Sequence, residues 1–241
     1  MTDANGLFGA TVDAIRGMQI VAQLPSLLVV GIGYRAGAIA ETVAVRHRDL
    51  TPSEDPFFED PLADQPTMGG AARTLAFIRQ ELMPWVASHF DISPTGATYF
   101  GHSLGGLFGA WVLLGQPETF DRYIIGSPST WWDGNKMAEH EAAYATDHDD
   151  LRAEVFFAIG AEETFDGRIR ESANLPAEQR ELVTVLPLDM VEDLNRLVDT
   201  LRRRAYPGLS MRHEVLADEV HVTVAPLIVS RGLRHLFGAP R

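Results

Sequence analysis

The start of the chain changes from a helical pattern to an unbroken apolar run. Apolar side chains in residues 7–20 recur with the spacing of one helix face, at Leu7, Val12, Ile15 and Met18. Residues 26–34 then form a continuous apolar run bounded by glycine, SLLVVGIGY. Because such a run has two apolar faces, it predicts a strand buried in a parallel sheet.

Strand and helix patterns alternate through the rest of the chain. Short apolar runs predict strands at 97–100, 122–129, 153–160 and 209–217. Helical apolar spacing predicts helices at 71–89, with a bend at Pro84, and at 104–114, 189–204 and 223–237. This alternation predicts an α/β fold with a mostly parallel sheet covered by helices on both faces.

Residues 46–70 interrupt the alternation. They are rich in proline, aspartate and glycine, which predicts a long irregular loop, and loops of this length usually carry function. No internal repeat or linker divides the 241 residues. We therefore expect residues 1–241 to form one α/β domain.

Charge and composition limit the partners. The formal charge of −13 disfavours nucleic acid and anionic lipid, because no sizeable basic surface offsets the repulsion. The chain has no cysteine, which excludes disulfides and thiolate catalysis. It shows neither a signal-peptide pattern nor an apolar run of transmembrane length, so we expect a cytoplasmic location and no membrane partner. Assembly into a homo-oligomer stays open.

One motif indicates nucleophilic chemistry. Residues 98–111, TYFGHSLGGLFGAW, place Ser103 in a G-x-S-x-G sequence between a predicted strand and a predicted helix. This is the pattern of a nucleophile elbow, whose strained turn lifts the serine hydroxyl above the strand end. The backbone N–H of Leu104 would then face an oxyanion. The alternative is a glycine-rich turn with an incidental serine.

A serine nucleophile needs a general base, and His221 has the best position among eight histidines. It follows the last predicted strand and precedes the last helix, which fits the chain order serine, acid, histidine of elbow hydrolases. The alternative is a surface histidine without a role. For the acid, the strand at 153–160 is followed by three carboxylates, Glu162, Glu163 and Asp166, which chain order does not separate.

Metal chemistry has little support. His140 and His148 lie eight residues apart among carboxylates, in EHEAAYATDHDD. A solvated helix accounts for this stretch, and the spacing is not that of a metal-ligand motif. We expect neither a metal nor a cofactor.

Taken together, six segments carry a resemblance to a known family. They are LVVGIGY, RDLTP, FIRQELMPWV, FGHSLGGLFGAW, FDRYIIGSPSTWWD and GLRHLFG. In this order they resemble the putative esterase (esterase D-like) family of α/β-hydrolases, and most closely its siderophore trilactone esterases. The resemblance implies Ser103 as nucleophile and His221 as base. The family's Gly-x-x-Glu points to Glu163 as the acid, although some trilactone esterases use a serine and histidine pair.

The chain departs from the family at its start. In the family, an apolar strand ending in Leu-Asp-Gly-Asn supplies a second oxyanion N–H, and residues 3–5 here match its Asp-Gly-Asn. The strand itself and two before it are missing, which leaves a gap between residues 26–34 and the elbow strand. Three explanations are open: the two strands pair directly, a partner chain fills the gap, or the sequence is a piece of a longer protein. We expect a longer protein. Asn5 would then offer its N–H from a mobile terminus.

These residues predict a serine carboxylesterase that works through an acyl-enzyme on a small-molecule ester, with a siderophore-type lactone as one candidate substrate. A non-catalytic binding protein and an acyltransferase are the alternatives. Predicted substrate-binding residues are Tyr34, Trp131, Trp132, Arg46 and Arg48. Because the surface is acidic, a neutral ester is the expected substrate unless a local arginine site exists.

Overall fold

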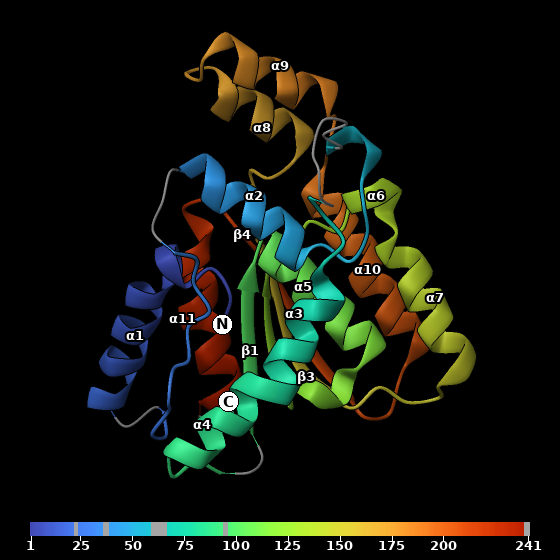
Figure 1. The fold of residues 1–241 in the computed structure, drawn as a ribbon. Coiled ribbons are helices and arrows are strands. Elements are labelled where there is room, and N and C mark those ends of the chain that lie inside the picture. The colour runs from blue at the N-terminus through green and yellow to red at the C-terminus, as the bar shows by residue number, and fades with distance from the viewer. Residues whose placement is uncertain (22–23, 36–38, 59–66, 94–95, 239–241) are drawn as a thin grey trace.

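A four-stranded sheet is the centre of the part of the chain that the structure describes, residues 1–21, 24–35, 39–58, 67–93 and 96–238. In this computed structural model the strands are β1 (Thr98–His102), β2 (Arg122–Gly126), β3 (Ala153–Gly160) and β4 (Leu209–Leu216). They pair in chain order and all run parallel, which confirms the predicted parallel sheet (Figure 1). The parallel register brings their carboxyl ends to one edge.

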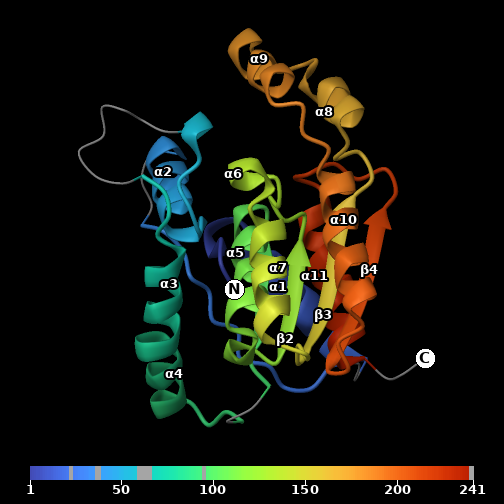
Figure 2. The same ribbon diagram turned by 90° about the vertical axis from the view of Figure 1, so that its right-hand side faces the viewer.

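Helices cover both faces of this sheet (Figure 2). On one face α11 (Val224–Phe237) packs against β2 and β3, and α1 (Ala4–Ile20) packs on the outside of α11. The other face carries α5 (Leu104–Gly115), α7 (Met137–Asp147) and α10 (Met190–Arg204). Buried apolar side chains form a separate cluster on each face. Because both faces are covered, the apolar side chains of β1, β2 and β3 are buried, whereas edge strand β4 is only partly covered and its Val215 is 43% exposed.

The predicted bend at Pro84 coincides with a change of helix type. The segment consists of α3 (Ala71–Phe77), a π-helical turn (Ile78–Leu82) and α4 (Met83–His89). The N–H of Met83 donates to the carbonyl of Ile78, five residues back. Proline has no N–H to donate, so it is accommodated at the second position of the new segment.

The predicted strand at 26–34 is wrong, since these residues have no strand assignment. Residues 1–4 lie between this segment and β1. The Met1 amine donates to the Val30 carbonyl at 2.9 Å, and the Ile32 N–H donates to the Met1 carbonyl at 2.8 Å. On the other side the Thr2 N–H donates to the carbonyl of Phe100 at 3.2 Å. The two apolar segments therefore do not pair directly.

Residues 1–5 are firmly held, which corrects the expectation of a mobile terminus. The side chain of Thr2 is buried, and its hydroxyl is hydrogen bonded to Tyr99 at 3.0 Å. The Asp3 carboxylate forms an ion pair with Arg46 at 2.6 Å. Asn5 follows in the first turn of α1.

The predicted loop at 46–70 begins later than expected. Helix α2 (Ile39–Leu50) includes its first five residues, and a 3-10 turn occupies Pro56–Phe58. Residues 59–66 lie outside the described residues. Arg46 and Arg48 are therefore helical.

Three further helices had no counterpart in the sequence prediction. They are α6 (Trp132–Asn135), α8 (Phe165–Ser172) and α9 (Ala177–Val185). Figures 1 and 2 show α8 and α9 as a hairpin above the carboxyl edge of the sheet. Among the described residues, no helix combines the length and the apolar character needed to cross a membrane.

Candidate active site

Ser103 lies in a strained turn at the carboxyl edge of the sheet. Strand β1 ends at His102 and α5 begins at Leu104, so a single residue joins them. Its φ of 61° and ψ of −120° are unusual for a residue with a side chain. The Ser103 N–H donates to the Gly126 carbonyl at 2.9 Å, and its own carbonyl accepts from Leu107 at 2.9 Å. The predicted elbow is therefore present.

The glycines around the serine are required by close packing. A Cβ on Gly101 would collide with the backbone carbonyl of Gly105. A Cβ on Gly105 would collide with the hydroxyl of Thr2, and would meet the Asp3 carboxylate at 2.9 Å. The turn is thus compressed between its own helix and residues 2–3.

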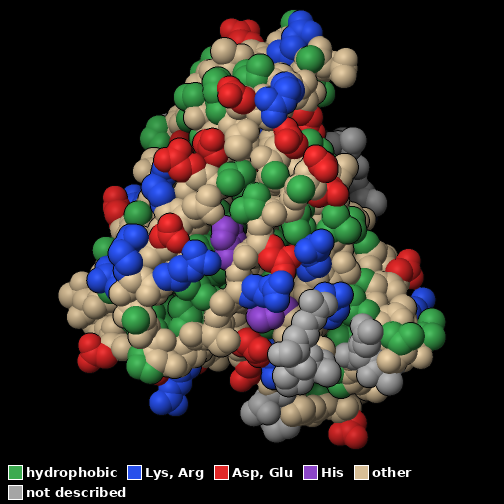
Figure 3. Space-filling model, turned by 180° about the vertical axis from the view of Figure 1, so that it is seen from behind, with side chains coloured by type: hydrophobic (Ala, Val, Ile, Leu, Met, Phe, Trp, Pro, Cys, Tyr) green, Lys and Arg blue, Asp and Glu red, His purple; other side chains and the backbone are tan. Residues whose placement is uncertain are grey.

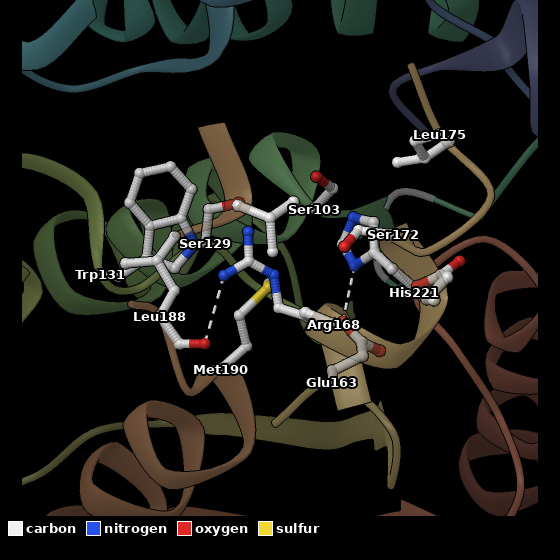
Figure 4. Close-up of a pocket in the computed structure, with 12 residues that line it drawn as sticks. Ser103, Ser129, Trp131, Glu163, Arg168, Ser172, Leu175, Leu188, Met190 and His221 are labelled. Atoms are coloured by element: carbon white, nitrogen blue, oxygen red, sulfur yellow. Dashed lines mark hydrogen bonds and ion pairs between the residues drawn. The ribbon is translucent and has the colours of Figure 1, made fainter. Parts of the chain in front are cut away.

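Glu163 and His221 form a hydrogen-bonded pair beside the serine. The His221 Nδ1 lies 2.6 Å from one Glu163 oxygen, and the carboxylate can only accept, so Nδ1 carries the proton. The other Glu163 oxygen accepts from the Ser127 hydroxyl at 2.6 Å and from the Gly160 N–H at 2.9 Å. Figure 4 shows the imidazole between Glu163 and Ser103. Its Nε2 is left available for a serine proton.

The structure separates the three candidate carboxylates. Glu163 is only 1% exposed and contacts His221. Glu162 instead forms an ion pair with Arg170, and Asp166 lies in the first turn of α8. Glu163 is therefore the carboxylate that can orient the imidazole.

Ser103 and His221 open into one cavity of about 250 Å³. Its walls come from the elbow, the turn after β2, the α8–α9 hairpin and the start of α10 (Figure 4). The lining residues are Ser103, Ser129, Trp131, Glu163, Arg168, Glu171, Ser172, Leu175, Val183, Leu188, Met190 and His221. Trp131, predicted to wall the pocket, is among them.

Arg168 brings a positive charge into this cavity. Its guanidinium donates to the carbonyls of Leu186 and Leu188, each at 3.2 Å. Burial lowers the pKa of the guanidinium, and the nearby carboxylates of Glu163 and Glu171 raise it. Among the described residues, no carboxylate forms an ion pair with Arg168. The cavity therefore contains a cation that lacks a carboxylate in direct contact.

Two helix ends face the elbow region. Leu104 begins α5, so its N–H has no acceptor within the helix. Asn5 lies in the first turn of α1, where the same argument applies to its backbone. Its side chain is engaged elsewhere, since it donates to the Tyr34 carbonyl at 2.8 Å and accepts from the Tyr34 N–H at 2.6 Å.

Trp132 and Tyr34, two of the predicted substrate-binding residues, do not line this cavity. Trp132 is 1% exposed, donates its indole N–H to the Ser53 carbonyl at 3.0 Å and stacks on Phe58. Tyr34 is held through its backbone by Asn5 and does not line the cavity. The adjacent Trp131 lines the cavity.

The two predicted arginines also lie outside the cavity. Arg46 binds the Asp3 carboxylate through two nitrogens and donates to the His102 carbonyl at 3.1 Å. Arg48 binds the carboxylate of Asp49 at 2.7 Å. Arg46 therefore joins residues 1–5 to the elbow, and neither side chain faces the pocket.

Sequence reasoning missed Ser127, Ser129 and Arg168. Ser127 and Ser129 belong to the SPS segment after β2, and the φ of 37° at Ser127 shows that this turn is also strained. Arg168 carried no sequence signal, because α8 was not predicted. In the described residues no cluster of three metal-binding side chains was found.

A parallel α/β sheet with an elbow serine, a histidine after the last strand and a buried carboxylate defines an α/β-hydrolase. Residues 51–195 match the family model described as "Putative esterase". The chain belongs to this family, and it is a hydrolase that acts on ester bonds.

Two curated relatives cover most of the chain. The ferri-bacillibactin esterase BesA of Bacillus subtilis is 30% identical, with 97% of this chain and 76% of the relative aligned. The siderophore triacetylfusarinine C esterase of Aspergillus fumigatus is 29% identical, over 87% of this chain and 70% of the relative. The predicted resemblance to siderophore esterases is thereby confirmed.

A solved structure shows the same fold. The siderophore hydrolase EstB from Aspergillus nidulans superposes with a TM-score of 0.77 at 26% identity, and covers 100% of this chain and 83% of its own. The predicted α/β-hydrolase fold is therefore confirmed.

Proposed function

We propose that Ser103, His221 and Glu163 form the catalytic triad of this esterase. The supporting observation is that Ser103 and the bonded pair of Glu163 and His221 open into one cavity. Glu163 holds the imidazole with Nδ1 protonated and stabilises the imidazolium that forms. This leaves Nε2 as the atom that removes the serine proton.

The reaction follows from this arrangement. Ser103 Oγ attacks the ester carbonyl carbon while His221 Nε2 takes the hydroxyl proton. The carbonyl oxygen becomes an oxyanion, which the N–H groups of Leu104 and Asn5 stabilise. The ester C–O bond then breaks, and the proton passes to the departing alcohol. Water repeats the sequence on the acyl-enzyme, releases the acid and restores Ser103.

Water is the acceptor that the site favours over another alcohol. The His221 side chain is 32% exposed, so solvent reaches the base directly. An acyltransferase needs to keep water from the acyl-enzyme, which an open imidazole does not do.

The proposed substrate is a siderophore-type ester with an anionic group. The curated relatives are named as siderophore esterases, and Arg168 supplies the local positive charge that such a group requires. Trp131 offers an aromatic face beside it. Arg168 therefore favours an anionic ester over the neutral one expected from the net charge of −13.

Covalent labelling tests the triad. A fluorophosphonate should modify the wild-type protein on Ser103, and Ser103→Ala should lose both the label and ester hydrolysis, by at least about 10³-fold. Ser129→Ala removes a hydroxyl from the same cavity and should keep the label. A folded wild type without an adduct would favour a non-catalytic binding protein.

Exchange of Arg168 tests the substrate class. Arg168→Gln should raise KM about tenfold for an ester with a carboxylate or catecholate group, because a buried charge-assisted contact is lost. Hydrolysis of a neutral ester of the same size should be unchanged. Arg170→Gln is the matched control, since Arg170 lies on the same helix and pairs with Glu162 outside the cavity. An equal effect of Arg168→Gln on both esters would exclude the anionic contact.

A further inference from the structure

His102, the residue before the serine, contacts the proposed general base His221. It is the last residue of β1 and is 8% exposed. Its Nε2 lies 2.9 Å from the backbone carbonyl oxygen of His221. The two imidazole rings are in contact, with centroids 4.6 Å apart. One side chain of the elbow strand therefore contacts both the ring and the backbone of His221.

The chemistry of this contact sets the proton positions on His102. A carbonyl oxygen only accepts, so Nε2 carries the hydrogen and Nδ1 does not. Nδ1 is buried without a hydrogen-bond partner in the described structure. It faces Gly126, where a Cβ would lie 3.2 Å from it and 3.1 Å from Ile228. Burial lowers the pKa of His102 to about 3, and the positive charges of His221 and Arg46 act in the same direction. His102 is thus a neutral donor at neutral pH.

The loop that carries His221 also forms hydrogen bonds to the turn that follows β3. The Glu162 N–H donates to the Glu219 carbonyl at 3.0 Å, and Glu163 binds the imidazole. Both residues belong to the turn after β3. Among the hydrogen bonds of the described residues, the bond from His102 joins this loop to β1, the strand that carries the nucleophile.

We propose that His102 is a positioning residue that sets the distance between nucleophile and base. Because it is bonded covalently to Ser103 and hydrogen bonded to His221, it connects the two reacting residues by a short path. Loss of its donor lets the loop shift relative to the elbow while the pair of Glu163 and His221 moves with β3. The inference rests on the proposed triad.

Two substitutions at one position separate a donor from a space-filling group. His102→Leu fills the site without a donor, and His102→Gln restores one. His102→Leu should lower kcat by about 10- to 100-fold with KM within a factor of two, since a small misplacement of a reacting group has effects of this size. His102→Gln should recover to within a few-fold of wild type. His235→Leu, which exchanges a half-buried histidine whose Nε2 is also buried without a partner, should keep wild-type turnover.

A spectroscopic readout keeps the test independent of activity. The His221 Nδ1 proton should give a downfield ¹H NMR signal from its bond to Glu163, and the signal should move in His102→Leu and return in His102→Gln. Wild-type turnover and signal in His102→Leu would overturn the proposal. So would equal losses in both variants, or failure of both to fold, because His102 would then serve the core alone. If Ser103→Ala retains activity, the proposed triad fails, while the NMR comparison still reports on His102 and His221.

Discussion

A carboxylate that is 1% exposed is costly unless donors surround it, and Glu163 has three. The Ser127 hydroxyl, the Gly160 N–H and the His221 imidazole satisfy its two oxygens. Each donor comes from a different segment of the chain. The side chain is therefore held in one orientation before any substrate arrives.

Glu163→Gln should lower kcat by on the order of 10³-fold, because an amide presents an N–H to the imidazole and no longer favours Nδ1 protonation. The measurement is kcat and KM on a single ester, together with thermal unfolding.

The neighbouring residue provides the control. Glu162→Gln changes the same chemistry at a partly exposed ion pair with Arg170, and kcat should stay within about twofold of wild type. If both variants have wild-type activity, the enzyme works with serine and histidine alone.

Among the elements, α10 and α8 show why one helix was predicted and the other was not. Helix α10 has an apolar stripe, and its N-cap Asp189 accepts from the Glu192 N–H at 2.9 Å. Helix α8 is shorter, polar and contains Gly167. It is capped by Thr164 and packs mainly against α9. A helix that packs on the core needs an apolar stripe, which is visible in the sequence. A helix in a hairpin above the sheet edge buries less surface, so its sequence needs no such stripe.

Helix α1 contains glycines that packing does not require. At Gly9 and Gly17 a Cβ would meet no atom within 4 Å, and both residues are exposed and helical. Gly9→Ala and Gly17→Ala should each raise the free energy of unfolding by about 0.5 to 1 kcal/mol, because alanine loses less backbone entropy on folding. Urea unfolding measures the change.

Gly105→Ala is the opposite case, since its Cβ would collide with Thr2. It should lower the unfolding free energy and disturb the elbow. A destabilised Gly9→Ala would show that α1 is not helical at this position.

At the scale of the whole molecule, two apolar clusters hold the sheet and the chemistry lies at its carboxyl edge. On the face seen in Figure 3, histidine side chains lie near the centre of the view, with apolar, acidic and basic side chains interspersed around them. The net charge of −13 is therefore not a guide to the local field at the site. Arg168 carries positive charge inside the cavity of an acidic protein.

Stability should fall as the pH is lowered from about 7 to 5. Burial lowers the pKa of His102 to about 3, and also lowers the pKa values of His47, His213 and His235. Below the ordinary histidine pKa of 6.5 the unfolded chain binds protons that the folded protein does not, so stability rises with pH in this range. For His102 alone the loss should be about 1 to 2 kcal/mol by pH 5.

Urea unfolding at pH 7.5, 6.5 and 5.5 measures this slope. His102→Gln should make it shallower, because glutamine does not titrate. An unchanged slope in this variant would show that the pKa of His102 in the folded protein is close to its value in the unfolded chain.

The sequence by itself determined the features that depend on residues close together in the chain, namely the helices, the strands and the elbow motif. Periodicity specified the four paired strands and helices such as α5, α10 and α11, since a helix or strand face is set within a few turns. The elbow at Ser103 was predictable because strand, glycines and helix are contiguous. Chain order was enough for His221, because a loop after the last parallel strand ends at the same edge.

The tertiary structure decided which side chains meet. Residues 26–34 have a strand pattern, but a strand also needs paired neighbours, and residues 1–4 form the bonds on one side. Glu162 and Glu163 are chemically alike, and the position of the loop after β4 selects the second. Arg46 pairs with Asp3 while Arg168 faces the pocket. Such contacts join segments far apart in the chain, and local pattern carries no information about them.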